Sequence, residues 1–131
     1  MSVALKIVDQ TLGVHPHVTR ELRLASERIT LRELIERRIE EEVAAINAGR
    51  GDIRPLVMPT RQEARLNGAK SVEAAQPVDP RKQLEAAITA FARTRIVVIV
   101  DGRQATDLDQ QIAVTPQTEV RFIKLVPLVG G

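Results

Sequence analysis

The chain has 131 residues, of which 44% are hydrophobic and 27% charged, with a formal net charge of +2 and no cysteine. These values are typical of one globular domain, and the missing cysteine excludes a disulfide framework, a thiolate metal site and a cysteine nucleophile. The small net charge and the presence of only two aromatic residues argue against nucleic-acid binding. No apolar run approaches the roughly 20 residues of a membrane span, so we expect no membrane partner and a cytoplasmic location.

Residues 3–24 are predicted to form a β-hairpin. Residues 3–8 and 18–24 each alternate between core-type and solvent-type side chains, the period of two that gives a strand one buried face. Arg20 breaks this pattern on the inward side, so we expect it near the edge of its strand. His15 and His17 flank Pro16 in the connecting turn, and without a third ligand they are interpreted as turn residues rather than a metal site.

A long helix is predicted to follow. Thr30 and Glu33 have the spacing of a capping box, in which each side chain binds the backbone N–H of the other residue, and Gly49 supplies a stop. Apolar residues recur at helical spacing between them, at Leu31, Leu34, Ile35, Ile39, Val43 and Ile46. The charged residues from Glu36 to Glu42 are interpreted as a solvated helix face, and Arg28, Arg37 and Arg38 as surface charge.

Residues 49–95 are divided into short pieces by glycines and prolines. A second capping box at Thr60–Glu63 predicts a short helix that closes at Asn67–Gly68. Asp79–Pro80 predicts the start of another helix, because proline is preorganised for the first helical position. The apolar stripe of this helix is Leu84, Ala87, Ile88 and Phe91. Residues 69–78 are expected to form a mobile loop.

The last third of the chain is predicted to be β-structure again. Residues 96–100 are all β-branched, and Asp101–Gly102 is a favoured dipeptide of a tight type I′ turn. Residues 103–119 are expected to be irregular, and residues 120–126 to form a strand that Pro127 ends. Asp101, Asp107 and Asp109 lack the glycine-centred pattern of a calcium loop and are interpreted as turn residues.

Three short segments carry a resemblance to a known family: residues 96–103 (IVVIVDGR), 118–122 (TEVRF) and 127–131 (PLVGG). They resemble the end of the small sulfur carriers of molybdopterin and thiamine synthesis, and the order hairpin, helix, strands resembles the β-grasp fold of ubiquitin-like proteins. The resemblance implies an α+β fold in which a mixed sheet packs on one long helix. Residues 1–131 would form a single ubiquitin-like domain, with a helical insertion at 49–95, between the helix and the third strand, and a flexible C-terminal tail at 126–131.

In that family a partner enzyme adenylates the terminal carboxylate with ATP and Mg²⁺, and the acyl group passes to a cysteine thiol or to sulfide. The resemblance therefore implies that Gly131 is the residue of covalent attachment, and that the activating enzyme recognises Pro127, Leu128, Val129 and Gly130. The chain itself would supply no catalytic residue, bind no cofactor and hold no metal. Because it has no cysteine, any thioester would form on a partner's thiol.

The resemblance leaves two functions open. The first is a ubiquitin-like protein modifier, whose partners would be an activating enzyme of the ubiquitin type, a conjugating enzyme, a deconjugating peptidase and target proteins. Residues 49–95 favour it, because dedicated sulfur carriers are compact. The alternative is a sulfur carrier that forms a thiocarboxylate at Gly131 for cofactor biosynthesis. A scaffolding domain without tail chemistry is a third class. For chain formation the side-chain amines are Lys6, Lys70, Lys82 and Lys124, of which Lys70 is expected to be the most accessible.

The strand at residues 96–100 is apolar on both faces. One face can fill the core, which leaves an outer patch of four residues: Val97, Ile99, Ile123 and Leu125. This patch is either a docking surface for the activating enzyme or a surface that the helix after Asp79 covers. An exposed patch of this size is unusual on a monomer, so we expect partial cover by that helix.

Overall fold

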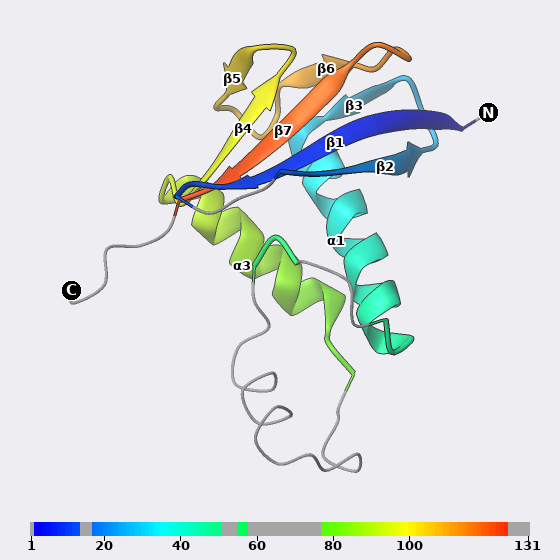
Figure 1. The fold of residues 1–131 in the computed structure, drawn as a ribbon, viewed down its shortest axis with the longest axis vertical. Coiled ribbons are helices and arrows are strands. Elements are labelled where there is room, and N and C mark those ends of the chain that lie inside the picture. The colour runs from blue at the N-terminus through cyan, green and yellow to red at the C-terminus, as the bar shows by residue number, and fades with distance from the viewer. Residues whose placement is uncertain (1, 14–16, 51–54, 58–76, 126–131) are drawn as a thin grey trace.

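The computed structural model describes residues 2–13, 17–50, 55–57 and 77–125. Within these residues the protein is an α+β structure in which two helices lie on one face of a mixed five-stranded sheet (Figure 1). The elements are β1 (Val3–Thr11), β2 (Val18–Leu24), β3 (Arg28–Thr30), α1 (Leu31–Asn47), α3 (Pro80–Ala92), β4 (Ile96–Val100), β5 (Arg103–Ala105), β6 (Gln111–Ala113) and β7 (Glu119–Lys124).

The large sheet has the strand order β2-β1-β7-β4-β5, and β3 pairs with β6 in a separate two-stranded sheet. β1 and β2 form the predicted antiparallel hairpin, in which Leu5 faces Leu22. β7 lies in the centre, parallel to β1, with Ile7 beside Val120, and antiparallel to β4, with Val98 beside Phe122. This arrangement is compatible with the expected β-grasp.

The sequence of α1 explains both of its ends. The Thr30 hydroxyl accepts a hydrogen bond from the Glu33 amide at 3.1 Å, and the Glu33 carboxylate accepts one from the Thr30 amide at 2.8 Å. The predicted capping box is therefore confirmed. Gly49 follows the helix with φ +85°, a backbone conformation that favours glycine. The apolar stripe of α1 is buried against the sheet, as predicted, at Leu31, Leu34, Ile35, Ile39 and Val43.

The helix predicted after Asp79 is α3, and Asp79 caps it through a 2.9 Å bond from the Arg81 amide. α3 lies beside α1 on the same face of the sheet (Figure 1), with Ala87 in the shared core and Leu84, Ile88 and Phe91 partly buried against it. The expectation that this helix partly covers the outer face of the sheet is therefore wrong. Its apolar stripe is already used on the inner side.

The last third of the chain contains more β-structure than expected. Asp101 and Gly102 both have positive φ, +48° and +86°, which confirms the predicted tight turn between β4 and β5. Residues 103–119 are not wholly irregular, because β5 and β6 lie within them. β6 pairs with β3 through Ile29 and Ile112, and Ile112 is buried.

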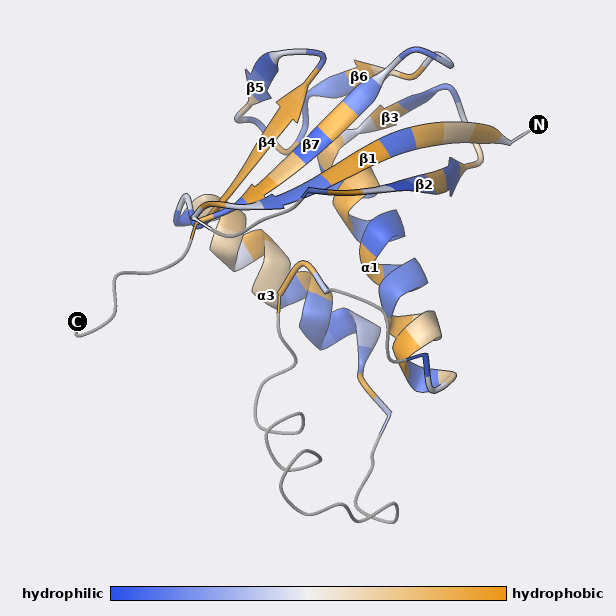
Figure 2. Ribbon diagram, in the orientation of Figure 1, coloured by the Kyte–Doolittle hydropathy of each residue, from blue (hydrophilic) through white to orange (hydrophobic). Residues whose placement is uncertain are grey.

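Hydropathy follows this architecture. Figure 2 shows β4 hydrophobic along its length, whereas β1 and β7 contain both hydrophobic and hydrophilic residues. Among the residues that the structure describes, neither helix has the length and apolar character needed to cross a membrane.

Candidate functional site

The predicted reactive end of the chain lies just beyond the described residues. Residues 126–131, which include Pro127, Leu128, Val129, Gly130 and Gly131, are outside them, so the structure describes the base of this segment and not the segment itself. The base is held on two sides: the Leu125 amide donates to the Arg95 carbonyl at 2.9 Å, and the Leu12 amide donates to the Lys124 carbonyl at 2.9 Å. Residue 126 therefore follows a backbone fixed between the end of β1 and the connection from α3 to β4.

The predicted docking patch is only partly assembled. Val97 and Ile123 face each other across β4 and β7, but the partner of Ile99 is Arg121. All three apolar side chains are half-buried. Leu125 lies past the end of β7 and lines a groove on the helix side of the sheet. No described helix covers the outer face, so this patch consists of three apolar residues beside a charged one.

Arg121 belongs to a chain of polar contacts on the outer face. Its guanidinium donates to the Gln10 amide oxygen at 3.0 Å and to the Glu119 carboxylate at 3.3 Å. The Lys6 ammonium lies 3.3 Å from the same carboxylate. The hydrogen bond from Lys6, followed by that from Arg121, holds the pKa of Glu119 below its ordinary value of 4.5, although partial burial acts in the opposite direction.

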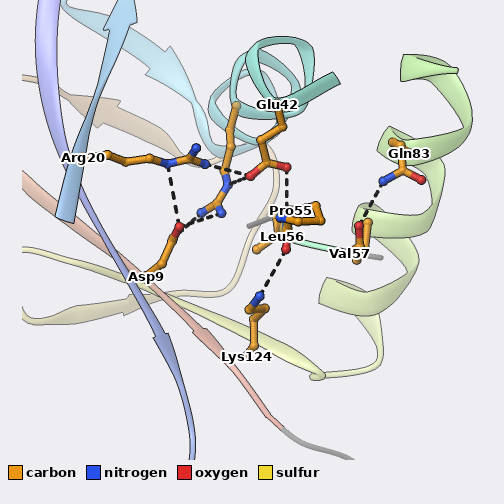
Figure 3. Close-up of polar contacts among 9 residues, drawn as sticks. Asp9, Arg20, Glu42, Pro55, Leu56, Val57, Gln83 and Lys124 are labelled. Carbon is orange, nitrogen blue, oxygen red and sulfur yellow. Dashed lines mark hydrogen bonds and ion pairs between the residues drawn. The ribbon is translucent and has the colours of Figure 1, made fainter. Parts of the chain in front are cut away.

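A buried charge cluster lies between the sheet and α1 (Figure 3), formed by Asp9, Arg20, Arg38 and Glu42. Both Arg38 and Glu42 have only 1% of their surface exposed. The interpretation of Arg38 as surface charge and of the whole 36–42 segment as a solvated face is therefore wrong at these two positions. Arg28 is exposed, as predicted, and Arg37 is half-buried.

Arg38 is the centre of this charge cluster. Its two terminal nitrogens bind the two carboxylate oxygens of Asp9, and its Nε donates to Glu42 Oε2 at 2.7 Å. Arg20 donates to the same Glu42 oxygen at 2.7 Å. The Arg38 guanidinium also lies 4.6 Å from the centre of the Phe122 ring, within the range of a cation–π contact. Arg20, expected near the edge of its strand, is the third residue of β2, and β2 itself is an edge strand of the sheet.

The charge cluster is balanced and saturated. It contains two cations and two anions, and every buried side-chain nitrogen and oxygen in the described part of the chain has a hydrogen-bond partner. Burial of these charges is compatible with folding because each one is paired and hydrogen-bonded. The charge cluster therefore acts as a structural connection between β1, β2 and α1.

Residues 55–57 are held by Glu42 of the charge cluster and by two side chains outside it, Lys124 and Gln83. Glu42 Oε1 accepts the Leu56 amide at 3.1 Å, Lys124 Nζ donates to the Pro55 carbonyl at 3.1 Å, and Gln83 Nε2 donates to the Val57 carbonyl at 3.0 Å (Figure 3). Leu56 is buried at 3% exposure. Three elements, α1, α3 and β7, thus fix the backbone of this short segment.

Val78 is fixed in a similar way. The Asn47 side chain donates to the Val78 carbonyl at 3.1 Å and accepts the Val78 amide at 2.8 Å. Val78 is the last residue of the expected mobile loop at 69–78, and at this end the expectation is wrong, because Val78 is buried. Residues 69–76, the helix predicted from Thr60 to Gly68, and Lys70 lie outside the described residues.

The residues that could suggest a metal site have other roles. Asp101 Oδ1 accepts the Glu119 amide at 2.9 Å and Asp107 Oδ1 accepts the Asp109 amide at 2.8 Å, which confirms their interpretation as turn residues. His17 is exposed, and His15 lies outside the described residues. Within the described ranges, no three acidic or histidine side chains are grouped as metal ligands would be.

A groove of about 800 Å³ opens beside the base of the C-terminal segment. It lies on the helix side of the sheet, between one face of α3 and the ends of β1 and β7. Leu56 and Leu125 contribute apolar surface, and Lys82 and Arg93 are two of the basic residues around it. The groove could not be predicted from the sequence, because the groove combines four segments that are distant in the chain.

Comparison of the chain with protein-family models, with curated proteins and with solved structures returned no match.

Proposed function

We propose that the chain is a ubiquitin-like protein modifier, activated by adenylation of the Gly131 carboxylate and transferred through partner cysteine thioesters to target proteins. The observation that carries the proposal is the position of β7. The last strand lies in the centre of the sheet, parallel to the first, and leads directly into the residues 126–131 that end in Gly130–Gly131. A β-grasp domain presents its C-terminal segment from such a strand, and the strand order here is compatible with that fold.

The chemistry of the chain end agrees with this role. Glycine at the last two positions leaves the terminal carbonyl open to a nucleophile and lets the backbone adopt conformations closed to other residues. With no cysteine in the chain, the thioester steps fall to the partner enzymes.

The additional helix favours a modifier over a sulfur carrier. α3 adds 13 residues beside α1, and residues 55–57 are built into the core by three polar side chains. These features enlarge the helix side of the molecule and give it a surface that a compact carrier does not need. The opposing observation is the ending Val129–Gly130–Gly131, which is more similar to the sulfur carriers than to ubiquitin.

The test is intact-mass analysis of the full chain after incubation with an activating enzyme of the ubiquitin type from the same cells, ATP and Mg²⁺. A modifier forms an acyl-adenylate and then a covalent adduct with a partner protein. A mass increase equal to replacement of one oxygen by sulfur, in the presence of a sulfide donor, identifies the carrier instead.

The matched variants add the same side chain at two places. Gly131→Val is expected to abolish every product, because a branched side chain crowds the reacting carbonyl, whereas Ala25→Val at an exposed loop position is expected to leave the yield unchanged. Both variants should have the same midpoint of urea unfolding as the wild type. Equal adduct formation by Gly131→Val and wild type would contradict the proposal.

A further inference from the structure

The groove beside α3 has an apolar floor and a basic rim. Its floor is formed by Leu56, Val57, Ala86, Ala90, Ile96 and Leu125. Leu56 and Ile96 are buried and the other four are half-buried, so the floor continues the core to the surface. Such a groove is suited to a segment with small or branched apolar side chains.

The basic residues at the rim of the groove favour an occupant that carries a negative charge. Lys82, Arg93 and Arg95 are exposed at its edge, and Lys124 also lines the groove while it binds the Pro55 carbonyl. Glu85 is the one acidic residue among those that line it within the described part of the chain. An occupant that joins apolar side chains to a carboxylate therefore matches both the floor and the rim.

We propose that this groove binds residues 126–131 of the same molecule, with the Gly131 carboxylate at Lys82. These residues directly follow Leu125, which is itself part of the groove wall. Their sequence supplies three apolar side chains, those of Val126, Leu128 and Val129, followed by the two glycines and the carboxylate.

The lengths agree with this placement. The groove follows α3 from Arg93, near the start of the segment, back to Lys82. Eleven residues of α-helix rise about 16 Å, and six extended residues reach at most about 20 Å. The segment can therefore extend from Leu125 along the groove and bring its carboxylate to Lys82.

Covalent attachment favours this occupant over a free one. A short tether gives the segment an effective concentration in the millimolar range, so even weak contacts fill the groove. The same end of the chain that we propose to be activated would then be held until the activating enzyme displaces it. This consequence rests on the proposed function, whereas docking itself does not.

Paramagnetic NMR of the full chain tests docking without any enzyme. The chain has no cysteine, so a nitroxide can be attached at a single introduced site. Arg81→Cys places the nitroxide beside Lys82, and Gln104→Cys is the control on β5; both positions are exposed. We expect the amide signals of Gly130 and Gly131 to broaden with the first label and not with the second.

The contribution of the Lys82 charge to docking is tested by replacing this lysine with a glutamate, which reverses its charge. Lys82→Glu should abolish the broadening, whereas Lys6→Glu, an exposed lysine outside the groove, should preserve it. If the proposed function is also correct, Lys82→Glu should raise the rate of adduct formation in proportion to the fraction of segments that it releases. Docking without adducts contradicts only the proposed function, and adducts without docking contradict only this inference.

Three results would overturn docking within one molecule. The first is no selective broadening of Gly130 and Gly131 by either label. The second is broadening only when a nitroxide-labelled, NMR-silent chain is mixed with an isotope-labelled one, which identifies a second copy as the source. The third is a response confined to residues 58–76, which assigns the groove to that segment.

Discussion

Replacing Arg38 by methionine removes the cation at the centre of the buried charge cluster while it keeps a long, apolar side chain against Phe122. The substitution deletes three hydrogen bonds, two to Asp9 and one to Glu42. Arg20 remains as the only cation of the charge cluster, facing two carboxylates. It lies 2.7 Å from Glu42 and 3.7 Å from Asp9, so it neutralises one carboxylate well and the other poorly.

The expected loss of stability is large for a single side chain. Glu42 is 1% exposed and Asp9 is 8% exposed, so neither carboxylate can recover its hydration without local opening. Breaking a buried ion pair by removing one partner costs about 3–5 kcal/mol, against a total of about 5–15 kcal/mol for a domain. With a urea m value of about 2 kcal/mol per molar, the unfolding midpoint should fall by roughly 2 M.

Urea unfolding followed by circular dichroism measures this change. The matched control is Arg32→Met in the same helix, where the ion pair with Asp109 has side chains that are 50% and 81% exposed. That variant should lose less than about 1 kcal/mol. The double variant Arg38→Met/Glu42→Gln should recover at least about 1 kcal/mol, because Arg20 and Asp9 then balance each other. A loss in Arg38→Met no larger than in Arg32→Met would refute the reasoning.

Two further predictions concern the β-sheet. Gly102 has φ +86°, a conformation that Asn tolerates better than the β-branched Val. Gly102→Val should therefore lower the unfolding free energy by about 1–2 kcal/mol, and Gly102→Asn by clearly less. Equal losses in urea unfolding would contradict the assigned turn. The pKa of Glu119 is lowered mainly by Lys6, so the stabilisation from this contact is complete above the ordinary value of 4.5 and is lost as pH falls through the folded-state value. Lys6→Gln should raise that pKa toward 4.5 in an NMR titration of the carboxyl carbon, and an unchanged titration midpoint would show that Lys6 is not the cause.

The features that the sequence predicted correctly are local ones. The capping box at Thr30 and Glu33, the cap at Asp79 and the turn at Asp101–Gly102 each depend on residues within four positions of one another. β5 and β6 were not predicted because each has only three residues. β6 also depends on pairing with the distant β3, whereas β5 pairs with β4 directly across the Asp101–Gly102 turn. Short strands of this kind carry almost no periodic signal.

The sequence contained an indication of the buried charge cluster, namely charged residues at inward positions, but the many charged residues around Arg38 obscured it. Arg38 and Glu42 occupy the same helical stripe as Leu34, Ile35 and Ile39, and in β1 Asp9 continues the inward positions of Leu5 and Ile7. Strand alternation likewise places Arg20 inward. Two cations and two anions on inward positions of neighbouring elements indicate mutual pairing, but the charged sequence around Arg38 suggested a solvated surface instead. The groove had no equivalent signal, because it depends on how α3 lies against the strand ends.

The fixed backbone at residues 55–57 and at Val78 sets the positions of the two ends of the segment that joins them. Glu42, Asn47, Gln83 and Lys124 hold these two ends from α1, α3 and β7. Each doubling in length of a joining segment costs only about 0.6 kcal/mol in closure entropy. A change in the length of the segment between Val57 and Val78 is therefore expected to cost little closure entropy, as long as these four side chains hold its ends.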